Sequence, residues 1–353
     1  MIIGEPAHLP DGPDRGGPAQ PLLSVRDLVK HFPVKGKGLF GKGAVVRAVD
    51  GVSFDIRKGE TLGVVGESGC GKSTTARLLM HLIKADSGEM VFDGEKVGAD
   101  LDLTAYRRQV QMVFQDSYAS LNPRLTIEES IAYGPQVHGV SAAKARAKAH
   151  DLLARVGLEP GRFAGRYPHE LSGGQRQRIN IARALALEPR LVILDEAVSA
   201  LDKSVEAQVL NLLQDLKDEF GLTYVFISHD LNVVKFIVDR VMVMYLGKVA
   251  EIGEGPAVFG APRHPYTAAL LASMPKMDPD ARSAEAPLTG DPPNPINPPS
   301  GCRFHTRCAL AEPVCSVQEP PLAAMEGLQE AACLMALPGS GHSRAPAPVE
   351  AAA

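Results

Sequence analysis

The chain has 353 residues and a formal net charge of −4, with 45% hydrophobic and 22% charged residues. This length accommodates one large α/β domain with a smaller appendage, and the charge excludes a global basic field that would attract nucleic acid or lipid. No apolar stretch approaches the ~20 residues of a membrane-spanning helix, so we expect the chain to be soluble by itself. Residues 1–21, rich in Pro, Gly and Asp, lack the apolar run of a secretory signal and are predicted to be a disordered tail.

Strands are predicted on both sides of a Gly/Lys-rich hairpin tip at residues 35–43. Residues 22–28 alternate between apolar and polar side chains, and residues 44–49 and 52–56 follow as two further strands. A short buried strand then leads into a glycine-rich turn and the first turn of a helix, all within residues 61–74.

This turn holds Gly66, Gly71, Lys72 and Ser73 at the spacing of a phosphate-binding loop. A polyphosphate needs several backbone N–H groups aimed at one point, and glycine lets the backbone approach that closely. Lys72 would reach the β- and γ-phosphates, and the Ser73 hydroxyl would bind the Mg²⁺ ion that bridges them. The loop therefore predicts nucleotide binding.

Between residues 87 and 255 strands and helices alternate, with a largely helical insertion from residue 116 to about residue 171. An apolar run typical of a central parallel strand ends in Asp195 and Glu196. In a nucleotide site, the first carboxylate holds Mg²⁺ through water, and the second orients or deprotonates the attacking water. The predicted strands cover 89–92, 110–115, 190–194 and the run before Ser228, and the predicted helices cover 142–156, 176–187 and 204–220.

With Leu-Ser-Gly-Gly-Gln at residues 171–175 between these two motifs, residues 22 to about 255 resemble the ATPase subunit of an ATP-binding cassette (ABC) transporter. The resemblance implies an α/β P-loop NTPase fold over residues 22–260. That fold has a RecA-like core, an antiparallel β subdomain and a helical signature subdomain at about 116–180. It also implies ATP and Mg²⁺ as cofactors.

The resemblance implies a role for each motif. Ser172 and Gly174 of the signature sequence would bind the γ-phosphate of ATP held by another ATPase, because a helix N-terminus with glycine N–H groups attracts an anion. Ala197 departs from the usual Pro, and we expect little effect because both acids remain. The implied catalytic residues are Glu196 as general base, His229 as the switch histidine, Gln115 of the Q-loop and Lys72. The implied Mg²⁺ ligands are Ser73, Gln115 and the Walker B acid Asp195. The implied nucleotide contacts are Phe32, which would stack on adenine, the Walker A residues Gly66, Glu67, Ser68, Gly69, Cys70, Gly71, Lys72, Ser73 and Thr74, the signature residues Ser172, Gly173 and Gly174, and Asp202 of the D-loop.

Flanking motifs are similar to the oligopeptide/dipeptide importer subgroup, and Asn-Pro-Arg at 122–124 resembles the F-type of its two paired ATPases. The other motifs are residues 66–70, 114–124, 167–169 and 264–267 and the proline-rich tail with its cysteines. The resemblance implies a peripheral ATPase on the cytoplasmic face of the inner membrane that drives uptake of di- and oligopeptides. Its implied partners are a paralogous ATPase in a head-to-tail heterodimer, two membrane permease subunits and, indirectly, an extracytoplasmic peptide-binding protein, with no nucleic acid. The alternatives are another cargo (nickel, an opine or a glutathione-like peptide), a homodimer, or a soluble ABC ATPase of translation or DNA repair.

Beyond residue 260 a proline-rich linker at 287–299 precedes four of the five cysteines, Cys302, Cys308, Cys315 and Cys333. Their spacing is wider than the paired C-x₂-C of most structural zinc sites, so a four-thiolate site is predicted with the metal left open. The subgroup resemblance implies a [4Fe–4S] cluster, with zinc as the alternative, and Arg303 and Arg307 would offset the cluster's negative charge. This extension is predicted over 261–337, with a disordered tail at 338–353.

Overall fold

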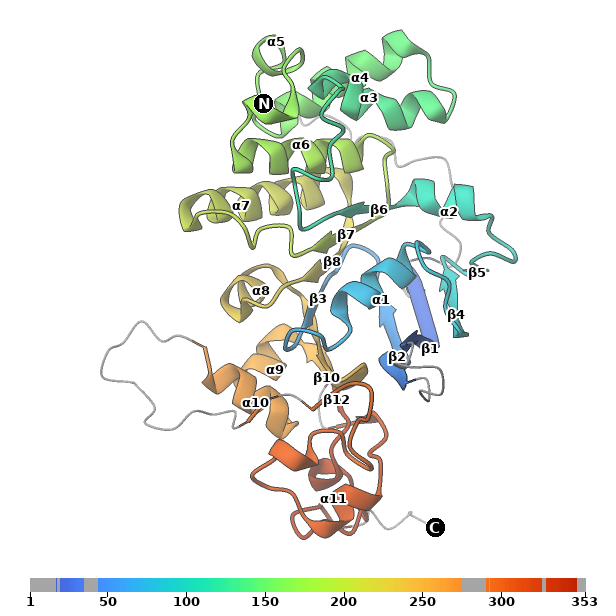
Figure 1. Ribbon diagram of the computed structural model, residues 1–353, viewed down its shortest axis with the longest axis vertical. Coiled ribbons are helices and arrows are strands. Elements are labelled where there is room, and N and C mark those ends of the chain that lie inside the picture. Colours follow the sequence, from blue (N-terminus) through green and yellow to red (C-terminus); the bar gives the residue numbers. More distant parts are fainter. Residues whose placement is uncertain are drawn as a thin grey trace, which may run out of the picture.

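The computed structural model describes residues 17, 20–34, 44–274, 290–291, 293–325 and 328–347. The predicted hairpin tip at 35–43 and most of the predicted N-terminal tail lie outside the described residues. Figure 1 shows a central sheet with a group of helices at one end of the molecule and the C-terminal extension at the other.

An eight-stranded sheet with the order β11-β12-β10-β9-β3-β8-β7-β6 forms the centre of the molecule. Its parallel part consists of β3 (Thr61–Val65), β6 (Val110–Val113), β7 (Leu191–Asp195), β8 (Thr223–Ile227) and β9 (Arg240–Tyr245). Every residue of β3, β7, β8 and β9 is buried, as expected for strands covered on both faces. Because β3, β7 and β8 are parallel, the segments that follow them emerge at the same edge of the sheet.

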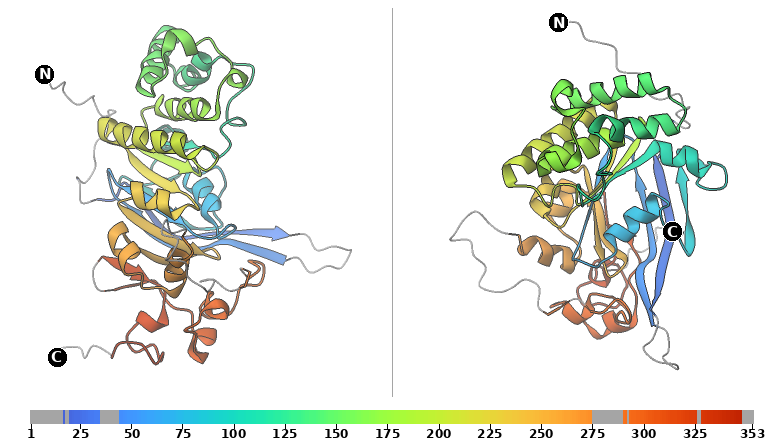
Figure 2. Two further views of the ribbon diagram at one scale, coloured as in Figure 1. Left: turned by 90° about the vertical axis from the view of Figure 1, so that its left-hand side faces the viewer. Right: turned by 45° about the horizontal axis from the view of Figure 1, so that its top comes forward.

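A second, antiparallel sheet has the order β2-β1-β4-β5. Its strands are β1 (Leu23–Val34), β2 (Ala44–Ile56), β4 (Ser87–Phe92) and β5 (Glu95–Lys96), and β1 and β2 project from the molecule as a long ribbon in Figure 2. The two strands predicted at 44–49 and 52–56 are one strand. Gly51, with φ of 79°, lies at an irregularity in the pairing with β1, which lets β2 continue through a bulge.

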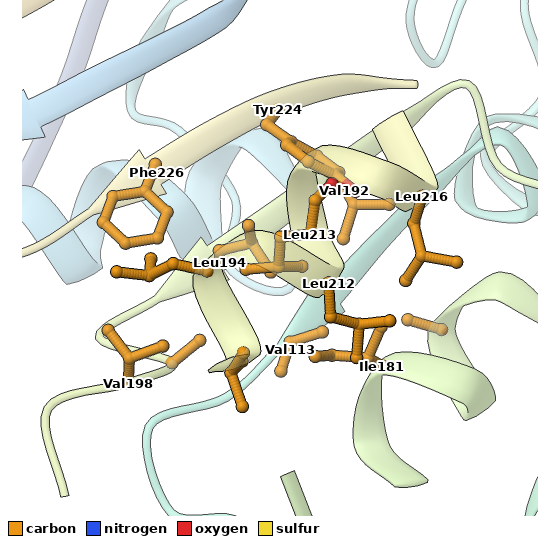
Figure 3. Packing of buried hydrophobic residues seen from close by; sticks show 14 of the residues in the cluster. Val113, Ile181, Val192, Leu194, Val198, Leu212, Leu213, Leu216, Tyr224 and Phe226 are labelled. Atoms are coloured by element: carbon orange, nitrogen blue, oxygen red, sulfur yellow. Dashed lines mark hydrogen bonds between the residues drawn. The ribbon is translucent and has the colours of Figure 1, made fainter. Parts of the chain in front are cut away.

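Helices cover the main sheet and build the helical insertion. The insertion comprises α3 (Ile127–Val137), α4 (Ala142–Arg155), α5 (Pro160–Phe163) and α6 (Gly173–Leu185). Leu212, Leu213 and Leu216 of α7 (Lys203–Phe220) pack between the sheet and α6, next to Val192, Leu194 and Tyr224 of the sheet and Ile181 of α6 (Figure 3). The remaining α-helices of the described residues up to residue 260 are α1 (Lys72–Leu79), α2 (Leu103–Gln109), α8 (Leu231–Ile237) and α9 (Gly255–Gly260).

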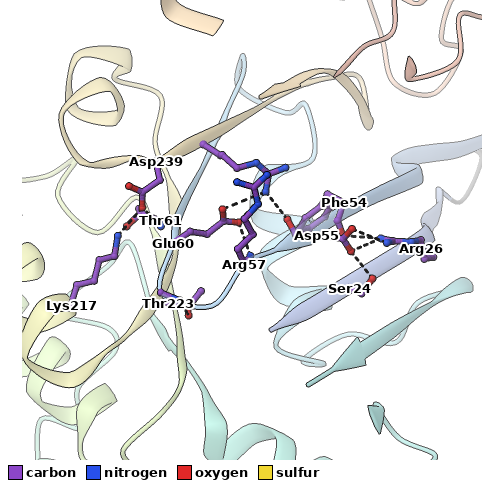
Figure 4. Close-up of polar contacts among 12 residues, drawn as sticks. Ser24, Arg26, Phe54, Asp55, Arg57, Glu60, Thr61, Lys217, Thr223 and Asp239 are labelled. Carbon is purple, nitrogen blue, oxygen red and sulfur yellow. Dashed lines mark hydrogen bonds and ion pairs between the residues drawn. The ribbon is translucent and has the colours of Figure 1, made fainter. Parts of the chain in front are cut away.

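Buried polar contacts fix the beginning of β3 (Figure 4). Glu60 Oε1 lies 3.0 Å from Arg240 Nη1, and both side chains are buried. Asp239 Oδ2 accepts hydrogen bonds from the backbone N–H of Thr61, at 2.7 Å, and from Lys217 Nζ, at 2.8 Å. These contacts tie β3 to β9 and α7, so the loop that follows β3 starts from a fixed position.

The C-terminal extension completes the edge of the main sheet, which the sequence did not predict. Its strand β12 (Gln329–Ala331) pairs antiparallel with β10 (Lys248–Glu254), and β11 (Ala323–Ala324) pairs with β12. The prediction of a disordered tail from residue 338 is wrong for residues 338–347, because Ser340 and His342 are buried and the His342 ring lies 3.0 Å from the Leu310 carbonyl oxygen. The other elements are α10 (Pro265–Ala272), α11 (Pro313–Val317) and short 3₁₀ turns at Pro168–Glu170, His305–Arg307 and Leu334–Ala336.

Among the helices of the described residues, none has the length and apolar character needed to cross a membrane.

Candidate nucleotide site

The turn after β3 has the backbone shape that the phosphate-loop prediction requires. Gly66 and Gly71 have φ of 148° and 111°, a region that residues with a Cβ rarely adopt. A Cβ at Gly66 would lie closer than van der Waals contact to the Met244 carbonyl oxygen, and one at Gly71 would clash with the Ala48 carbonyl oxygen. Both glycines are therefore required by packing against β9 and β2 as well as by the turn itself.

Lys72 and Ser73 begin α1 directly after this turn. Lys72 is buried, and its Nζ donates to the carbonyl oxygens of Gly66, at 2.7 Å, and Glu67, at 3.1 Å. Ser68 and Gly69 form the exposed tip of the loop, whereas Thr74 is half-buried in α1. The loop thus surrounds the lysine ammonium group with backbone, and the N-terminus of α1 adds its positive dipole.

Asp195, at the end of β7, lies next to the phosphate loop. Ser73 Oγ donates a hydrogen bond to Asp195 Oδ1 at 3.1 Å. Burial raises the pKa of the Asp195 carboxyl, against the opposing hydrogen bond from Ser73. A hydroxyl and a carboxylate at this separation are hard oxygen donors of the kind that Mg²⁺ prefers, and a bound cation would favour the ionised carboxylate. The pair therefore fits the predicted Mg²⁺ site.

The Glu196 side chain contacts two other predicted catalytic residues, Gln115 and His229. Its Oε2 accepts a hydrogen bond from Gln115 Nε2 at 2.9 Å and lies 3.4 Å from His229 Nδ1. Its φ is 49°, a left-handed backbone conformation, and its N–H donates to the Ile227 carbonyl oxygen at 3.0 Å. Strained backbone of this kind persists where surrounding structure holds it, which is common at functional sites. Ala197, at the position where the resembling proteins carry Pro, is buried and leaves both acids in place.

Phe32 lies on β1 with 38% of its surface exposed, so it is not a core ring. The Lys30 ammonium lies 5.5 Å from the ring centroid. The neighbouring His31 turns the other way, and its Nε2 lies 2.8 Å from Asp50 Oδ1 on β2. An exposed aromatic ring on a fixed strand is suited to stacking on a planar base.

The signature residues do not join the phosphate loop of their own chain. Ser172 caps α6 in a capping box, in which its Oγ accepts from the Gln175 N–H and Gln175 Oε1 accepts from the Ser172 N–H. Helix α6 starts three residues before the predicted position for this reason. Asp202 precedes α7 and is exposed. In the described part of the chain, no hydrogen bond or ion pair joins residues 171–175 to residues 66–74.

Two arginines of the extension contact residues of the N-terminal domain, so the role predicted for them from the sequence is corrected. Arg307 donates to both carboxylate oxygens of Glu67, at 2.6 and 3.0 Å, and Arg303 pairs with Asp50. Their charges are thus engaged by carboxylates rather than directed at the cysteines. Sequence reasoning missed the Glu67–Arg307 contact because the two residues are 240 positions apart and no local pattern connects them.

The four cysteines of the extension line one small cavity of about 20 Å³ together with His264, Phe304 and Leu310. Burial raises the pKa of Cys302 to about 11 and also raises the pKa of the Cys308 and Cys333 thiols. Four soft thiol donors on one cavity fit an iron or zinc centre chemically. The four thiols are not arranged around a common metal position. Among the described residues, no three His, Cys, Asp or Glu side chains are placed so that they could hold a metal ion.

Cys70 lies apart from this cavity, inside the phosphate loop. Its side chain is 3% exposed, and burial raises the pKa of its thiol. The loop therefore presents backbone at this position, and the thiol faces inward toward Gly66.

Comparison with known proteins places the chain in a family. The model described as "ABC transporter" matches residues 49–199, and the model "Oligopeptide/dipeptide transporter, C-terminal region" matches residues 250–315. The chain is 51% identical over 329 residues to a probable peptide ABC transporter ATP-binding protein, y4tS, of Sinorhizobium fredii, covering 92% of this chain and 91% of that protein. The chain belongs to the ABC transporter family.

Further relatives and solved structures agree with this ABC assignment. The oligopeptide transport ATP-binding protein AppF of Bacillus subtilis is 52% identical over 306 residues, covering 85% of this chain and 92% of that protein. The cassette MJ0796, solved as a dimer bound to ADP and Pi, is 32% identical with a TM-score of 0.56, covering 66% of this chain and 98% of that one. CbiO1 of Clostridium perfringens has a TM-score of 0.59 at 27% identity, covering 68% and 91%. The α/β fold of an ABC ATPase is thereby confirmed, and the chain is an ABC-type ATPase.

Proposed function

We propose that this chain is the ATP-hydrolysing subunit of an ABC importer that takes up di- and oligopeptides across the cytoplasmic membrane. The observation that carries the proposal is the continuous similarity, at about half of all positions, to two proteins named as peptide and oligopeptide transport ATP-binding proteins. That similarity includes the C-terminal region, which has its own oligopeptide/dipeptide family model. A cassette ATPase of translation or DNA repair would not need such an extension.

The residues at the edge of the sheet have complementary roles in this proposal. Lys72 and the loop N–H groups bind the β- and γ-phosphates, and Phe32 stacks on adenine. Mg²⁺, when bound by Ser73 and Asp195, supplies charge neutralisation. Gln115 and His229 both contact Oε2 of Glu196 and orient its carboxylate, and Glu196 accepts the proton of the attacking water.

A head-to-tail dimer with a paralogous ATPase is part of the proposal. The signature helix α6 presents a capped N-terminus with exposed Ser172, and nothing on its own chain's phosphate loop meets it among the described residues. A second ATPase would bring the ATP bound in its own phosphate loop to this terminus, where the helix N-terminus attracts the negatively charged phosphates. The structure of the related cassette MJ0796 is a dimer.

Docking on two permease subunits would place the chain on the cytoplasmic face of the membrane, with the peptide-binding protein acting indirectly. The helical insertion and the Q-loop expose several large apolar side chains, a feature typical of protein interaction surfaces. They are Phe114, Tyr118, Tyr133, Val137 and Tyr167.

The test is Glu196→Gln in the assembled transporter. We expect ATP binding to persist and ATP hydrolysis to fall by about 10²-fold or more, because an amide cannot accept the proton of water. Glu330→Gln, the same change at an exposed glutamate outside the site, is the matched control and should leave ATP hydrolysis unchanged. ATPase activity near that of the wild type in the Glu196→Gln transporter would contradict the assignment. Uptake of labelled dipeptides and tripeptides, in competition with nickel, tests the cargo.

We also propose a metal centre at Cys302, Cys308, Cys315 and Cys333, with a [4Fe–4S] cluster ahead of zinc. What supports it is that all four cysteines line one cavity, two of them buried and two partly buried, in an extension with a small core. Such a centre would stabilise the extension, since thiolates bound to metal cross-link segments that are distant in sequence.

Purification without oxygen tests the metal centre. We expect a brown protein that contains iron and acid-labile sulfide, and Cys302→Ser should bleach it while Cys70→Ser should not. A colourless preparation with one equivalent of zinc would show that the site binds zinc and not an iron–sulfur cluster. A metal-free preparation would contradict the proposal.

A further inference from the structure

The turn at residues 302–308 of the extension is wedged against the ATPase domain. Phe304 is buried among aromatic rings, with centroid distances of 5.4 Å to Tyr245 and 5.3 Å to Tyr266. Arg303 pairs with Asp50 and donates to the Leu246 carbonyl oxygen. The turn is therefore held by apolar packing in its middle and by ion pairs, which leaves Arg307 in a defined position at its end.

From this position Arg307 forms an ion pair with Glu67 of the phosphate loop. Its guanidinium donates to both oxygens of Glu67, at 2.6 and 3.0 Å, and to the Tyr245 hydroxyl at 3.3 Å. The Arg307 side chain is only 5% exposed and that of Glu67 21% exposed, so this bidentate pair is poorly screened by solvent.

The Glu67 backbone is fixed from the same side. Its N–H donates to the Tyr266 hydroxyl at 2.9 Å, and its carbonyl oxygen accepts from Lys72 Nζ at 3.1 Å. Tyr266 is fully buried at the start of α10 and packs against Tyr245, with a centroid distance of 4.6 Å and the rings tilted by 52°. Backbone and side chain of one phosphate-loop residue are thus both held by the C-terminal part of the chain.

The pair also has an electrostatic consequence. Glu67 puts a negative charge in a loop that binds a polyanion, and an unpaired carboxylate there would repel the phosphates. A buried guanidinium beside it cancels that charge while keeping the carboxylate ordered.

We infer that Arg307 is a positioning residue for ATP binding: through Glu67 it sets the shape and the charge of the phosphate loop, so that the extension determines the affinity for ATP. The inference rests on the proposed binding of ATP phosphates by this loop.

The experiment measures the Kd for Mg-ATP of the full-length chain, and KM and kcat for ATP in the assembled transporter. Arg307→Met keeps the length of the side chain but removes its charge, and it should raise Kd and KM about tenfold with kcat changed less than twofold. Arg307→Lys should restore part of the affinity, since it returns the charge without the bidentate geometry. Arg344→Gln, at an exposed arginine that follows the extension, is the matched control and should leave both constants unchanged.

A double variant separates positioning from general stability. If Arg307 acts through Glu67, adding Glu67→Gln to Arg307→Met removes the unpaired charge and should recover most of the lost affinity. A purely structural role predicts additive losses in the double variant. A folded Arg307→Met protein with Kd within twofold of the wild type, or additive losses, would overturn the inference.

Lys72→Ala distinguishes the failure of this inference from the failure of the proposed site. If Lys72→Ala abolishes ATP binding and Arg307→Met does not affect it, only the role of Arg307 is wrong. If Lys72→Ala binds ATP normally, the phosphate site itself is wrong, and the inference falls with it.

Discussion

Two helix N-termini in this molecule are suited to binding phosphate, and they are built differently. Helix α1 has no side-chain cap, since Gly71 precedes it in a left-handed conformation at the end of the glycine-rich turn. Helix α6 is closed by its own capping box between Ser172 and Gln175. The first terminus lies in a loop held by β2, β9 and the extension, whereas the second stands on the helical insertion.

The difference shows which terminus needs the rest of the chain. The phosphate loop has a demanding backbone that local residues alone do not stabilise, so Tyr266 and Arg307 support it. The signature helix begins without help from distant residues, because its capping box satisfies the N–H groups of Ser172 and Gln175 locally. A terminus that is stable by itself and exposed is suited to meet a second molecule.

The largest effect is expected for Lys72→Ala. Removing the ammonium from the phosphate loop should weaken Mg-ATP binding by roughly 10²-fold, because charge-assisted hydrogen bonds to the phosphates are lost. Equilibrium binding to the full-length chain measures this. Lys84→Ala, after the end of α1, is the control, and unchanged affinity in Lys72→Ala would refute the difference between the two termini.

Replacing glycine by alanine should lower the unfolding free energy at the start of α1 but not at the start of α6. Gly71→Ala should cost about 2–4 kcal/mol of unfolding free energy, because its φ is 111° and the new Cβ meets the Ala48 carbonyl oxygen. Gly173→Ala should change it by less than about 0.5 kcal/mol, since the nearest atom to a new Cβ is Leu201 Cδ2 at 3.8 Å. Denaturant unfolding of the two variants gives the comparison, and equal losses would refute it.

A signature substitution should act on the partner's site. In the proposed head-to-tail dimer, when one subunit already carries Lys72→Ala, we expect the remaining ATPase activity to come from the Walker A loop of the partner ATPase. Adding Ser172→Arg to the same subunit should lower that activity at least about tenfold, because the bulky side chain blocks the γ-phosphate position. An unchanged residual activity would contradict head-to-tail pairing.

The smallest effect concerns the pH dependence of stability at His264, which caps the helix that carries Tyr266, a residue in contact with the phosphate loop. Burial lowers the pKa of His264 to about 4 from 6.5, and its Nδ1 accepts the Tyr266 N–H. The folded state therefore binds fewer protons than the unfolded state, so stability is full above pH 6.5 and falls as the pH drops toward 4.

His264→Asn keeps a helix-capping acceptor for Tyr266 but does not titrate in this range. Between pH 7.5 and 5.5 the wild type should lose about 1 kcal/mol more unfolding free energy than this variant. Denaturant unfolding at the two pH values measures the difference. Identical pH dependence of the two proteins would show that folding does not lower the pKa of His264.

Much of the site follows from short-range patterns. The spacing of Gly66, Gly71, Lys72 and Ser73 indicates a phosphate loop, and the apolar strand before Asp195 indicates a central parallel strand. Since parallel strands end at one edge of their sheet, the proximity of Ser73, Asp195 and Glu196 could be expected from the order of elements. Periodicity and loop chemistry are local, so the sequence by itself determined these elements and the ABC resemblance.

Tertiary structure alone decided what holds the loop. The contact of Arg307 with Glu67, the addition of β12 to β10 and the packing of His342 against the extension join segments that no spacing relates. The same holds for β2, where pairing with β1 carries one strand through Gly51 although the sequence suggests two. Local patterns encode backbone conformation, whereas pairing between distant charges and strand edges depends on how the finished elements pack, and the extension's role in supporting the phosphate loop is of this second kind.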